Sequence, residues 1–382
     1  MRFKTCLKIN LNKLKENYRK LRELANSNKV LFVIKSNAYG HGIVPIVRFA
    51  VTELGIDSFG SASLGEAIIL RTSLPDLQFD LYVFSDLEFE NEYHNRHLIN
   101  KRIIPVISTI RNLKLILESD LCKYIPLCLK FDTGMNRLGI KYAEIEELIT
   151  LLKAHNKSSL FHVMSHFASS SSKITEDSGN GPYKQYQQFK EIKKILIQNG
   201  FTIERSSMAN SGAIEQKFAL EEETHIRPGL LLYGLSSLNK ELRSSSNSNW
   251  SGENISSLET HVIDFYKIKK GDPIGYGGPL SPRDGTLVYL AYGYGDGLLN
   301  FYNKLKVEHC GFVGEIIGRI SMDLMALLFP TEAHNHFNAG DTVLIWDHTP
   351  NKILSIADEH RVIPYEILCG ISDRVPRVYT LS

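Results

Sequence analysis

The chain has 382 residues, of which 43% are hydrophobic and 23% charged, so it can bury a large core and form two domains. Its formal net charge of +2, without a dense basic run among aromatic residues, argues against nucleic acid or a membrane surface as a partner. The five cysteines form no close CxxC pair, and Lys4 and Lys8 interrupt any N-terminal signal peptide, so we expect a cytoplasmic protein without a disulfide framework, a zinc site or a membrane span.

The first part of the chain alternates strand-like and helix-like segments. A short strand is predicted at 5–10, and apolar residues at helical spacing predict an amphipathic helix after it. Further strands are predicted at 30–34, 57–60, 79–84, 103–107, 125–131, 160–165, 203–207 and 224–226, with helices at 43–53, 64–72, 109–118, 143–154 and 182–198. The segment between the third and fourth of these strands is unclear. This alternation over about 250 residues predicts a (β/α)8 TIM-like barrel at 11–235 rather than an open doubly wound sheet.

The sequence changes character beyond the predicted barrel. Residues 236–257 are rich in Ser and Asn, which predicts a linker or exposed loop with little to pack. Strands separated by Gly, Pro and Asp turns are then predicted at 258–267, 287–291, 306–313, 315–319, 324–328 and 342–346, with one helical stretch at 355–361. We therefore expect a mostly β domain over 258–382.

Polar side chains stand where the predicted barrel strands end. Lys35 ends the first strand in VIKSNAYGHG, Lys130, Asp132 and Arg137 follow the fifth in LKFDTGMNRLG, and His166 ends the sixth in MSHFA. Asn210 and Ser211 follow the seventh in MANSG, and Arg227 and Gly229 follow the eighth in HIRPG. Active-site residues of such barrels cluster at the C-terminal strand ends, so these groups should share one rim. A lysine there can be desolvated, lose its proton and attack a carbonyl, although a lone lysine is more often a surface residue.

These five motifs resemble, in the same order, those of the alanine racemase family. The resemblance covers nearly the whole chain, and it implies that Lys35 carries pyridoxal 5'-phosphate (PLP) as a Schiff base. It also implies an obligate homodimer with shared active sites, in which Tyr276 of GDPIGYGG reaches into the other subunit. In the family the lysine acts on the D-side proton of alanine and the tyrosine on the L-side proton, which supplies D-alanine for peptidoglycan. The strand at 5–10 would join the sheet of the β domain.

The resemblance implies further roles. The cofactor-binding residues would be Lys35, Tyr39, His166, Asn210, Ser211, Arg227, Gly229, Leu230 and Tyr365, of which Tyr39, Ser211, Tyr365 and the amides near Gly229 and Leu230 would hold the phosphate. Arg227 would face the pyridine nitrogen and keep it unprotonated, because a guanidinium only donates hydrogen bonds. Arg137, Met322 and Asp323 would meet the substrate, and Lys130 is carbamylated in many members, which would hold Arg137. The plainer alternatives are a rim ion pair for Arg227 and a surface pair between Lys130 and Asp132.

A free tyrosine is a poor base at pH 7, so a nearby cation must favour the phenolate of Tyr276. His166 and Arg137 are the candidates. At the expected entrance, Tyr294 matches a family aromatic, but Leu298, Leu299 and Asn300 replace the Tyr-Pro-Arg that often follows. Ser171 stands where the family often has an acidic residue. We expect that neutral groups replace an Arg–carboxylate pair there, so that the chemistry survives while the selectivity of the entrance is open.

Three alternatives remain at this point. A racemase of the same fold that acts on serine, lysine, arginine or several amino acids would share the catalytic residues, so the motifs do not separate it from an alanine racemase. A PLP-dependent decarboxylase has the same architecture, but Arg227 and the HFA, ANS and RPG motifs argue against it. A PLP-binding regulatory protein without turnover resembles the barrel alone, and the second domain with Tyr276 argues against that.

Overall fold

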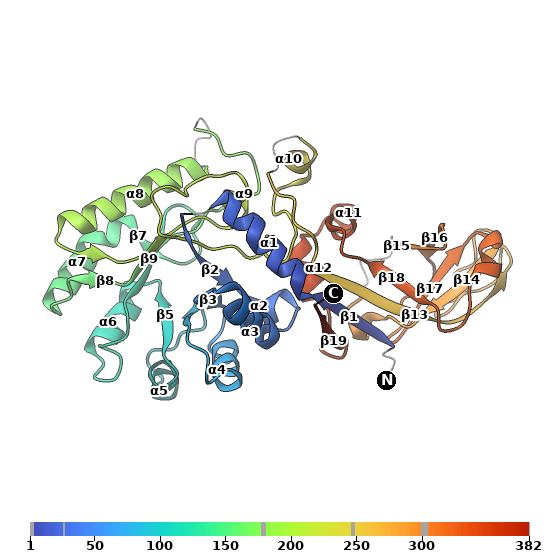
Figure 1. Cartoon of the computed structure of the whole chain (residues 1–382), viewed down its shortest axis with the longest axis horizontal. Helices are drawn as coiled ribbons and strands as arrows, with labels where there is room; N and C mark the ends of the chain where they lie inside the picture. Colours follow the sequence, from blue (N-terminus) through green and yellow to red (C-terminus); the bar gives the residue numbers. More distant parts are fainter. Residues whose placement is uncertain (1–3, 26, 177–180, 246–248, 299–304, 382) are drawn as a thin grey trace.

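The computed structural model describes residues 4–25, 27–176, 181–245, 249–298 and 305–381. A barrel wrapped by helices lies on the left of Figure 1, and a mostly β domain lies on the right. The long strand β13 (Ser256–Ile268) runs from the junction into the right-hand domain. This arrangement confirms the predicted fold class.

Eight parallel strands of the described residues follow one another around the barrel in chain order. They are β2 (Lys29–Val33), β3 (Ser58–Ser61), β4 (Asp80–Val83), β5 (Ile103–Ile107), β6 (Cys128–Asp132), β9 (His162–Met164), β11 (Ser206–Ser207) and β12 (His225–Ile226). The last strand, β12, pairs with the first, β2. Between β11 and β12 the sheet is joined by a single backbone bridge from Asn210 to Arg227, so the barrel is nearly closed.

Amphipathic helices cover the barrel where the sequence predicts them. These are α1 (Leu11–Leu24), α3 (Ile43–Leu54), α4 (Leu64–Ser73), α6 (Ile110–Glu118), α7 (Ile145–Ala154) and α8 (Pro182–Gln198). The unclear segment after the third predicted strand contains a further helix, α5 (Glu92–Asn100). Only Asn95 and Leu98 of α5 are buried, so its sequence lacks the apolar stripe that identifies a helix. Short strands β7 (Ile140–Lys141), β8 (Ser159–Leu160) and β10 (Thr202–Ile203) lie beside the barrel.

The second domain is built on one sheet whose strands run in the order β15, β16, β17, β14, β13, β1, β19. Their bounds are β1 (Thr5–Asn10), β14 (Gly285–Leu290), β15 (Lys306–His309), β16 (Phe312–Ile316), β17 (Met325–Phe329) and β19 (Arg377–Thr380), and β18 (Thr342–Trp346) also pairs with β13. Strand β1 is antiparallel to β13 and parallel to β19. The expectation that the N-terminal strand joins this sheet is therefore confirmed.

Several predicted elements of the second domain are wrong in detail. The expected strands at 306–313 and 315–319 are one hairpin of β15 and β16, which turns at Cys310 and Gly311. Both turn residues have positive φ, +49° and +79°, as a tight two-residue hairpin requires. Helix α11 (Pro350–His360) begins earlier than predicted, and α12 (Pro364–Cys369) was not predicted; each has a proline in its first turn, where the missing N–H costs nothing.

The Ser- and Asn-rich stretch at 236–257 is better packed than its composition suggests. It contains helix α10 (Lys240–Ser244), and Leu238 and Asn254 are buried. Arg243 forms an ion pair with Asp358 of α11 at 2.7 Å. The expectation that this stretch has little to pack is wrong for these residues, because polar side chains satisfied by hydrogen bonds can be buried as well as apolar ones.

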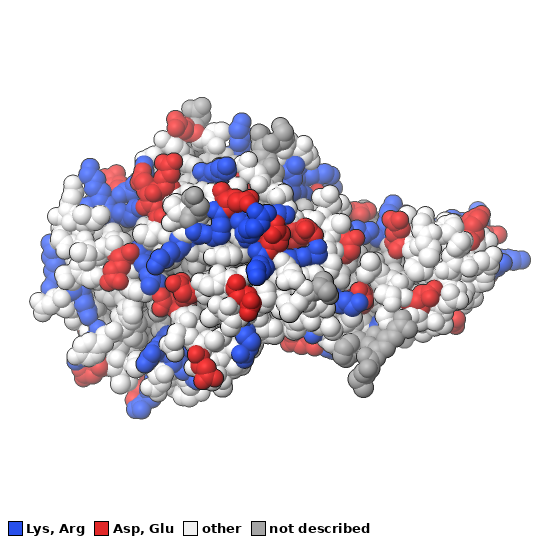
Figure 2. All heavy atoms as spheres, viewed as in Figure 1, with Lys and Arg blue, Asp and Glu red and all other residues white. Residues whose placement is uncertain are grey.

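Charges of both signs are interspersed on the face of the molecule shown in Figure 2. All five cysteines are free thiols. None of the helices in the described ranges has the length and apolar character needed to cross a bilayer.

Candidate active site

A cavity of about 800 Å³ lies at the C-terminal ends of the barrel strands. The predicted site residues that line it are Lys35, Tyr39, Lys130, Arg137, His166, Ser171, Asn210, Ser211, Arg227, Gly229 and Tyr365. Helix α12 closes one side with Ile363, Glu366 and Cys369. The structure therefore brings all five polar groups of the predicted rim into one space.

Other predicted site residues lie elsewhere. Within the described ranges, Tyr276, Tyr294, Met322 and Asp323 do not line this cavity. Tyr276 is 71% exposed, at the tip of the loop between β13 and β14, and the glycines on either side of it have positive φ. Leu230 is buried beside the cavity. Asn300 lies outside the described residues, so the structure gives no position for it.

The loops that carry Tyr294 and Met322 are joined to each other. The N–H of residue 295 donates to the Met322 carbonyl at 2.9 Å. Arg374, which lies shortly after α12, pairs with Asp296 at 3.2 Å and with Asp323 at 2.6 Å. This ion network ties both loops to the same segment of chain that closes the barrel cavity.

A left-handed turn carries the lysine. Every residue from 36 to 39 has a φ between +51° and +56°, a conformation that non-glycine residues adopt only at a cost in energy. The Glu66 carboxylate accepts the N–H of residue 37 at 2.9 Å, while Arg377 and Tyr379 donate to the carbonyls of residues 40 and 41 at 3.0 and 2.9 Å. Contacts from two distant segments, helix α4 and strand β19, thus hold Lys35 and Tyr39 at the cavity.

Two tilted ring contacts fix the Tyr39 side chain. Its ring lies between those of Tyr365 and Tyr233, with centroids 5.4 and 4.8 Å away. Burial raises the pKa of Tyr39 well above its usual value, and that of Tyr365 to about 12, so both hydroxyl groups stay protonated and can donate. A Cβ on Gly229 would lie 2.5 Å from the Tyr39 hydroxyl. Glycine is therefore required where the hydroxyl approaches the backbone.

Hydrogen-bond donors converge beside this hydroxyl. Ser211 Oγ accepts the N–H of Gly229 at 3.0 Å, and Asn210 caps the short helix α9 (Ser211–Glu215). The buried Leu230 N–H has no hydrogen-bond partner among the residues that the structure describes. Because buried donors are seldom left unpaired, this corner suits an anion that brings its own acceptors.

Arg227 is buried at the floor of the cavity with 5% exposure. Its Nη1 donates to the Ser207 carbonyl at 2.6 Å and to Ser207 Oγ, and its Nη2 donates to the Ser165 carbonyl. These partners are not carboxylates, so the alternative of a rim ion pair is wrong. The Nε of Arg227 has no partner in the described part of the chain, which leaves one N–H for a ligand.

Positive charge dominates the cavity. Burial, followed by the charges of Arg137 and Arg227, lowers the pKa of Lys130 to about 8, and burial followed by Arg137 lowers that of Lys35. Burial and the same cations lower the pKa of His166 well below its usual value. His166 is therefore neutral at pH 7, and of the two cations proposed to favour a tyrosine phenolate only Arg137 remains.

Asp132 does not neutralise this charge. Its carboxylate pairs with Lys141 at 2.5 Å and accepts the N–H groups of residues 134 and 136 at 2.9 and 3.1 Å. The alternative of an ordinary Lys130–Asp132 pair is therefore wrong, because Lys130 lines the cavity while Asp132 faces the loop that follows β6.

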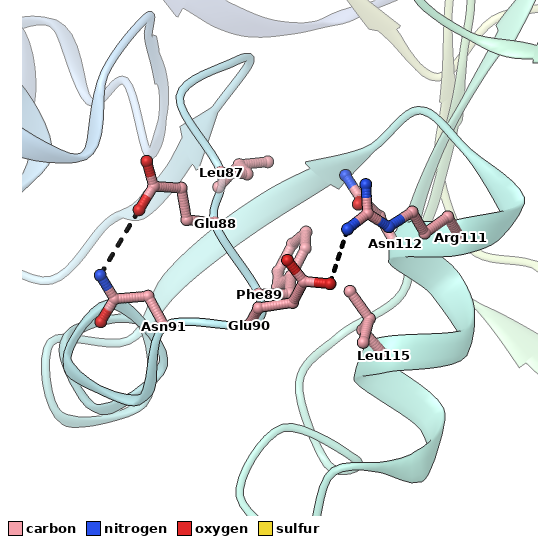
Figure 3. Close-up of a pocket in the computed structure, with 8 residues that line it drawn as sticks. All are labelled: Leu87, Glu88, Phe89, Glu90, Asn91, Arg111, Asn112 and Leu115. Atoms are coloured by element: carbon pink, nitrogen blue, oxygen red, sulfur yellow. Dashed lines mark hydrogen bonds and ion pairs between the residues drawn. The ribbon is translucent and has the colours of Figure 1, made fainter.

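A second hollow, of about 480 Å³, lies between the loop after β4 and helix α6 (Figure 3). Its charged groups face each other: Glu90 pairs with Arg111 at 2.6 Å. Both side chains are mostly exposed, so solvent screens the pair. The barrel cavity differs because the cations that line it form no ion pairs with other described residues. We therefore take this cavity as the candidate active site.

Sequence patterns did not reveal several residues that shape the cavity. Ser63 and Glu66 form the S-x-x-E pattern that starts a helix, yet Glu66 also clamps the lysine turn. Tyr233, Ser207 and Cys369 stand in runs without a distinctive motif. Only the folded chain brings these residues to the cavity or its floor.

Comparison with known proteins agrees with this geometry. Residues 9–237 match the family described as "Alanine racemase, N-terminal domain", and residues 255–379 match "Alanine racemase, C-terminal domain". This chain belongs to the alanine racemase family. The biosynthetic alanine racemase of Escherichia coli (strain K12) is 30% identical over 388 residues, which covers 97% of this chain and 98% of that protein. The alanine racemase of Pasteurella multocida (strain Pm70) is 30% identical over 381 residues and 97% of both chains.

Solved alanine racemases share the fold over its full length. The enzyme from the D-cycloserine producer Streptomyces lavendulae superposes with a TM-score of 0.84 at 26% identity, covering 100% of this chain and 98% of the other. The alanine racemase from Bartonella henselae, described with covalently bound pyridoxal phosphate, has a TM-score of 0.83 at 25% identity and covers 99% of this chain and 100% of its own. The chain is thus an alanine racemase family member in both domains.

Proposed function

We propose that this chain is a PLP-dependent alanine racemase that interconverts L-alanine and D-alanine, with Lys35 and Tyr276 as the two bases, and so supplies D-alanine for peptidoglycan. The observation that carries the proposal is the cavity itself. Lys35 stands beside an anion-binding corner and a buried guanidinium, in a chain of this family.

The residues of the cavity fit PLP. The phosphate fits the corner where the Tyr39 and Tyr365 hydroxyls, Ser211 and the free Leu230 N–H meet, and where a Cβ on Gly229 would intrude. The pyridine nitrogen fits the free Nε–H of Arg227. His166 and Asn210 complete the lining. When bound, PLP supplies an electron sink for the carbanion that removal of the α-proton leaves.

The chain's own groups divide the remaining work. The lowered pKa of Lys35 increases the share of neutral amine at pH 7, so Nζ can take up a proton from one face of the α-carbon. Arg227 can only donate, so it holds the pyridine nitrogen unprotonated and restrains side reactions. Arg137 is the cation positioned to attract the substrate carboxylate and to favour a phenolate on the opposite face.

We further propose that the site is completed in a homodimer. Tyr276, Tyr294, Met322 and Asp323 are displayed on the β domain, and none of them lines the cavity of its own chain. A second subunit that places these loops over the cavity would supply the second base, the Met322–Asp323 backbone for the substrate carboxylate, and Tyr294 at the entrance.

Lys130 is the residue that we expect to be carbamylated. Its pKa of about 8 keeps part of the amine neutral and able to react with carbon dioxide. The resulting anion would stand among Arg137 and Arg227, neither of which forms an ion pair with a carboxylate of the described residues. It would hold Arg137 beneath the phenolic oxygen of the cofactor, as the family resemblance implies.

The decisive test is chiral chromatography after purified, PLP-loaded protein has been incubated separately with L-alanine, L-serine, L-lysine and L-arginine. We expect D-alanine as the main product, and its loss in Lys35→Ala and Tyr276→Phe. Formation of D-serine or a basic D-amino acid at a comparable rate would instead favour a racemase of the same fold with another or broader substrate. Bound yellow cofactor without any D-product would favour a decarboxylase or a non-catalytic PLP protein.

The entrance residues give a narrower test. Ser171 lines the cavity as a neutral group. The double variant Ser171→Asp with Asn300→Arg should keep alanine turnover within a few-fold, because both charges are introduced together and can pair. Complete loss of turnover would refute the proposal that neutral groups replace an ion pair there.

A further inference from the structure

A line of buried polar groups crosses the interior of the barrel and ends at Arg227. Tyr82 and His162 are both fully buried, on β4 and β9. His162 Nδ1 lies 3.1 Å from the Tyr82 hydroxyl, and its Nε2 lies 2.8 Å from Ser207 Oγ. Ser207 Oγ in turn accepts from Arg227 Nη1. Burying polar groups away from water costs free energy unless each group has a hydrogen-bond partner.

The far end of the line reaches the opposite end of the barrel. The Tyr82 hydroxyl accepts from Arg205 Nη1 at 3.0 Å, and the same nitrogen donates to Asp80 at 2.6 Å. Asp80 begins β4, whereas Arg227 directly follows β12. The line therefore spans the barrel from the N-terminal to the C-terminal ends of its strands, between apolar neighbours such as Leu31, Val106 and Met164.

His162 is the central member because it alone joins the two hydroxyl groups. Burial, and then the charges of His225, Arg227 and Arg205, lower its pKa well below the usual value, so the imidazole is neutral. A neutral imidazole between two hydroxyl groups closes the line in either tautomer, since each hydroxyl can donate or accept. A hydrophobic ring at 162 would leave Ser207 without this partner.

We propose that His162 is a positioning residue for Arg227, acting through Ser207. It fixes the Ser207 side chain as an acceptor for Nη1, and Nη1 then sets the plane in which the guanidinium presents its free Nε–H to the cavity. This inference rests on the proposed role of Arg227 towards the pyridine nitrogen of PLP. The two-base reaction itself does not otherwise involve His162.

A matched control lies next to it. His225 is also a buried histidine of the barrel, and its ring centroid is 5.4 Å from that of His162. Its Nδ1 contacts Thr224, and its Nε2 is buried without a partner among the described residues. His225→Phe therefore makes the same chemical change in the same layer and leaves the line intact.

The experiment compares His162→Phe, His162→Gln and His225→Phe with wild type. We expect His162→Phe to raise the dissociation constant of PLP, measured by titrating the apo-protein, and to lower kcat by about tenfold with little change in KM. The amount of pyruvate formed per D-alanine should rise, since a loosened guanidinium would restrain transamination less; in that side reaction alanine gives its amino group to PLP and water releases it as pyruvate. His162→Gln keeps a polar partner for Ser207 and should recover much of the loss.

Equal values for His162→Phe and His225→Phe in PLP affinity, kcat and pyruvate would overturn the proposal. If His162→Phe does not fold, Ser207→Ala and Tyr82→Phe each remove one hydroxyl from the line, and Ser207→Ala should have the larger effect. If wild-type protein forms no D-alanine, the proposed function is refuted instead. The PLP dissociation constants of the variants would still test the role of His162.

Discussion

The barrel rim and the loops of the β domain hold their polar groups in opposite ways. On the rim, Lys35, Ser211 and Arg227 are fixed by contacts within one chain and converge on one cavity. On the β domain, Tyr276 and Met322 are more than half exposed and meet no cavity of their own chain. The rim residues thus enclose a cavity within one chain, whereas the β-domain residues reach a cavity only if a second subunit supplies it, as we propose.

The largest expected effect is in subunit complementation, which tests whether Lys35 and Tyr276 of different subunits form one site. Heterodimers of one Lys35→Ala and one Tyr276→Phe subunit, co-expressed with different affinity tags, contain one site that lacks both bases and one that is intact. If the sites are shared, such heterodimers should recover about half of the wild-type activity per dimer, although each homodimeric variant is inactive. The measurement is D-alanine formation after tandem purification. Inactive heterodimers would mean that both bases belong to one chain.

A smaller effect is expected at the corner of the barrel cavity where Gly229 meets Tyr39. In Gly229→Ala the new Cβ would meet the Tyr39 hydroxyl at 2.5 Å, so one of the two must shift. PLP affinity should fall about tenfold, as for other groups that support a bound cofactor. Adding Tyr39→Phe should not restore the affinity, because it leaves the ring carbon 3.1 Å from the new Cβ and removes a hydroxyl that the phosphate would use. Gly65→Ala, in helix α4 and open to solvent, is the control that should change nothing; an unaltered PLP titration for Gly229→Ala would contradict the prediction.

The β-domain loops should respond differently. Arg374→Ala removes the pairs with Asp296 and Asp323 that hold the loops of Tyr294 and Met322. Because Arg374 and Asp323 are exposed, we expect the KM for alanine to rise only about threefold while kcat is kept. High salt should produce part of the same change in wild type. Arg96→Ala, which breaks an exposed pair on α5, is the control, and equal KM values for the two variants would argue against the network.

The last prediction concerns the pH dependence of stability. The Lys130 pKa falls from 10.5 to about 8 on folding, so between these values the unfolded chain binds a proton that the native chain does not. The free energy of unfolding should therefore rise from pH 8 to 10.5, and this gain is absent below pH 8. Lys130→Met should flatten the rise and be more stable than wild type below pH 8. Urea unfolding of apo-protein in CO2-free buffer measures this, with exposed Lys15→Met as the control; parallel profiles for wild type and Lys130→Met would contradict it.

The sequence predicts the rim well because polar residues directly follow apolar strands there. Lys35 directly follows an apolar run, while His166 and Arg227 follow short strands, and a barrel places the ends of all these strands on one side. Helix α8 and strand β18 were predicted with their observed bounds because their apolar spacing and flanking turns are clear. These features depend on residues close together in the chain.

Features that depend on distant residues were not predictable in this way. Neither Tyr82 nor His162 stands in a motif, and their line exists only because β4, β9 and β11 share the barrel interior. The direction in which Asp132 points depends on Lys141, and the neutral state of His166 depends on its burial and then on cations from three other segments. A pattern of residue types holds no information on such pairings until the strands are placed.

The left-handed turn after Lys35 has a consequence for the synthesis of the protein. Arg377 and Tyr379 bind the carbonyls of residues 40 and 41, and a Cβ at residue 40 would lie only 2.2 Å from the Leu368 carbonyl oxygen. Residues 377 and 379 are translated long after residues 36–39, so the turn lacks these two contacts while the chain between them is being made. We expect a nascent chain without them to relax this costly backbone. If Lys35 carries PLP as proposed, we expect the cofactor to bind only after residues 377 and 379 have packed against the turn.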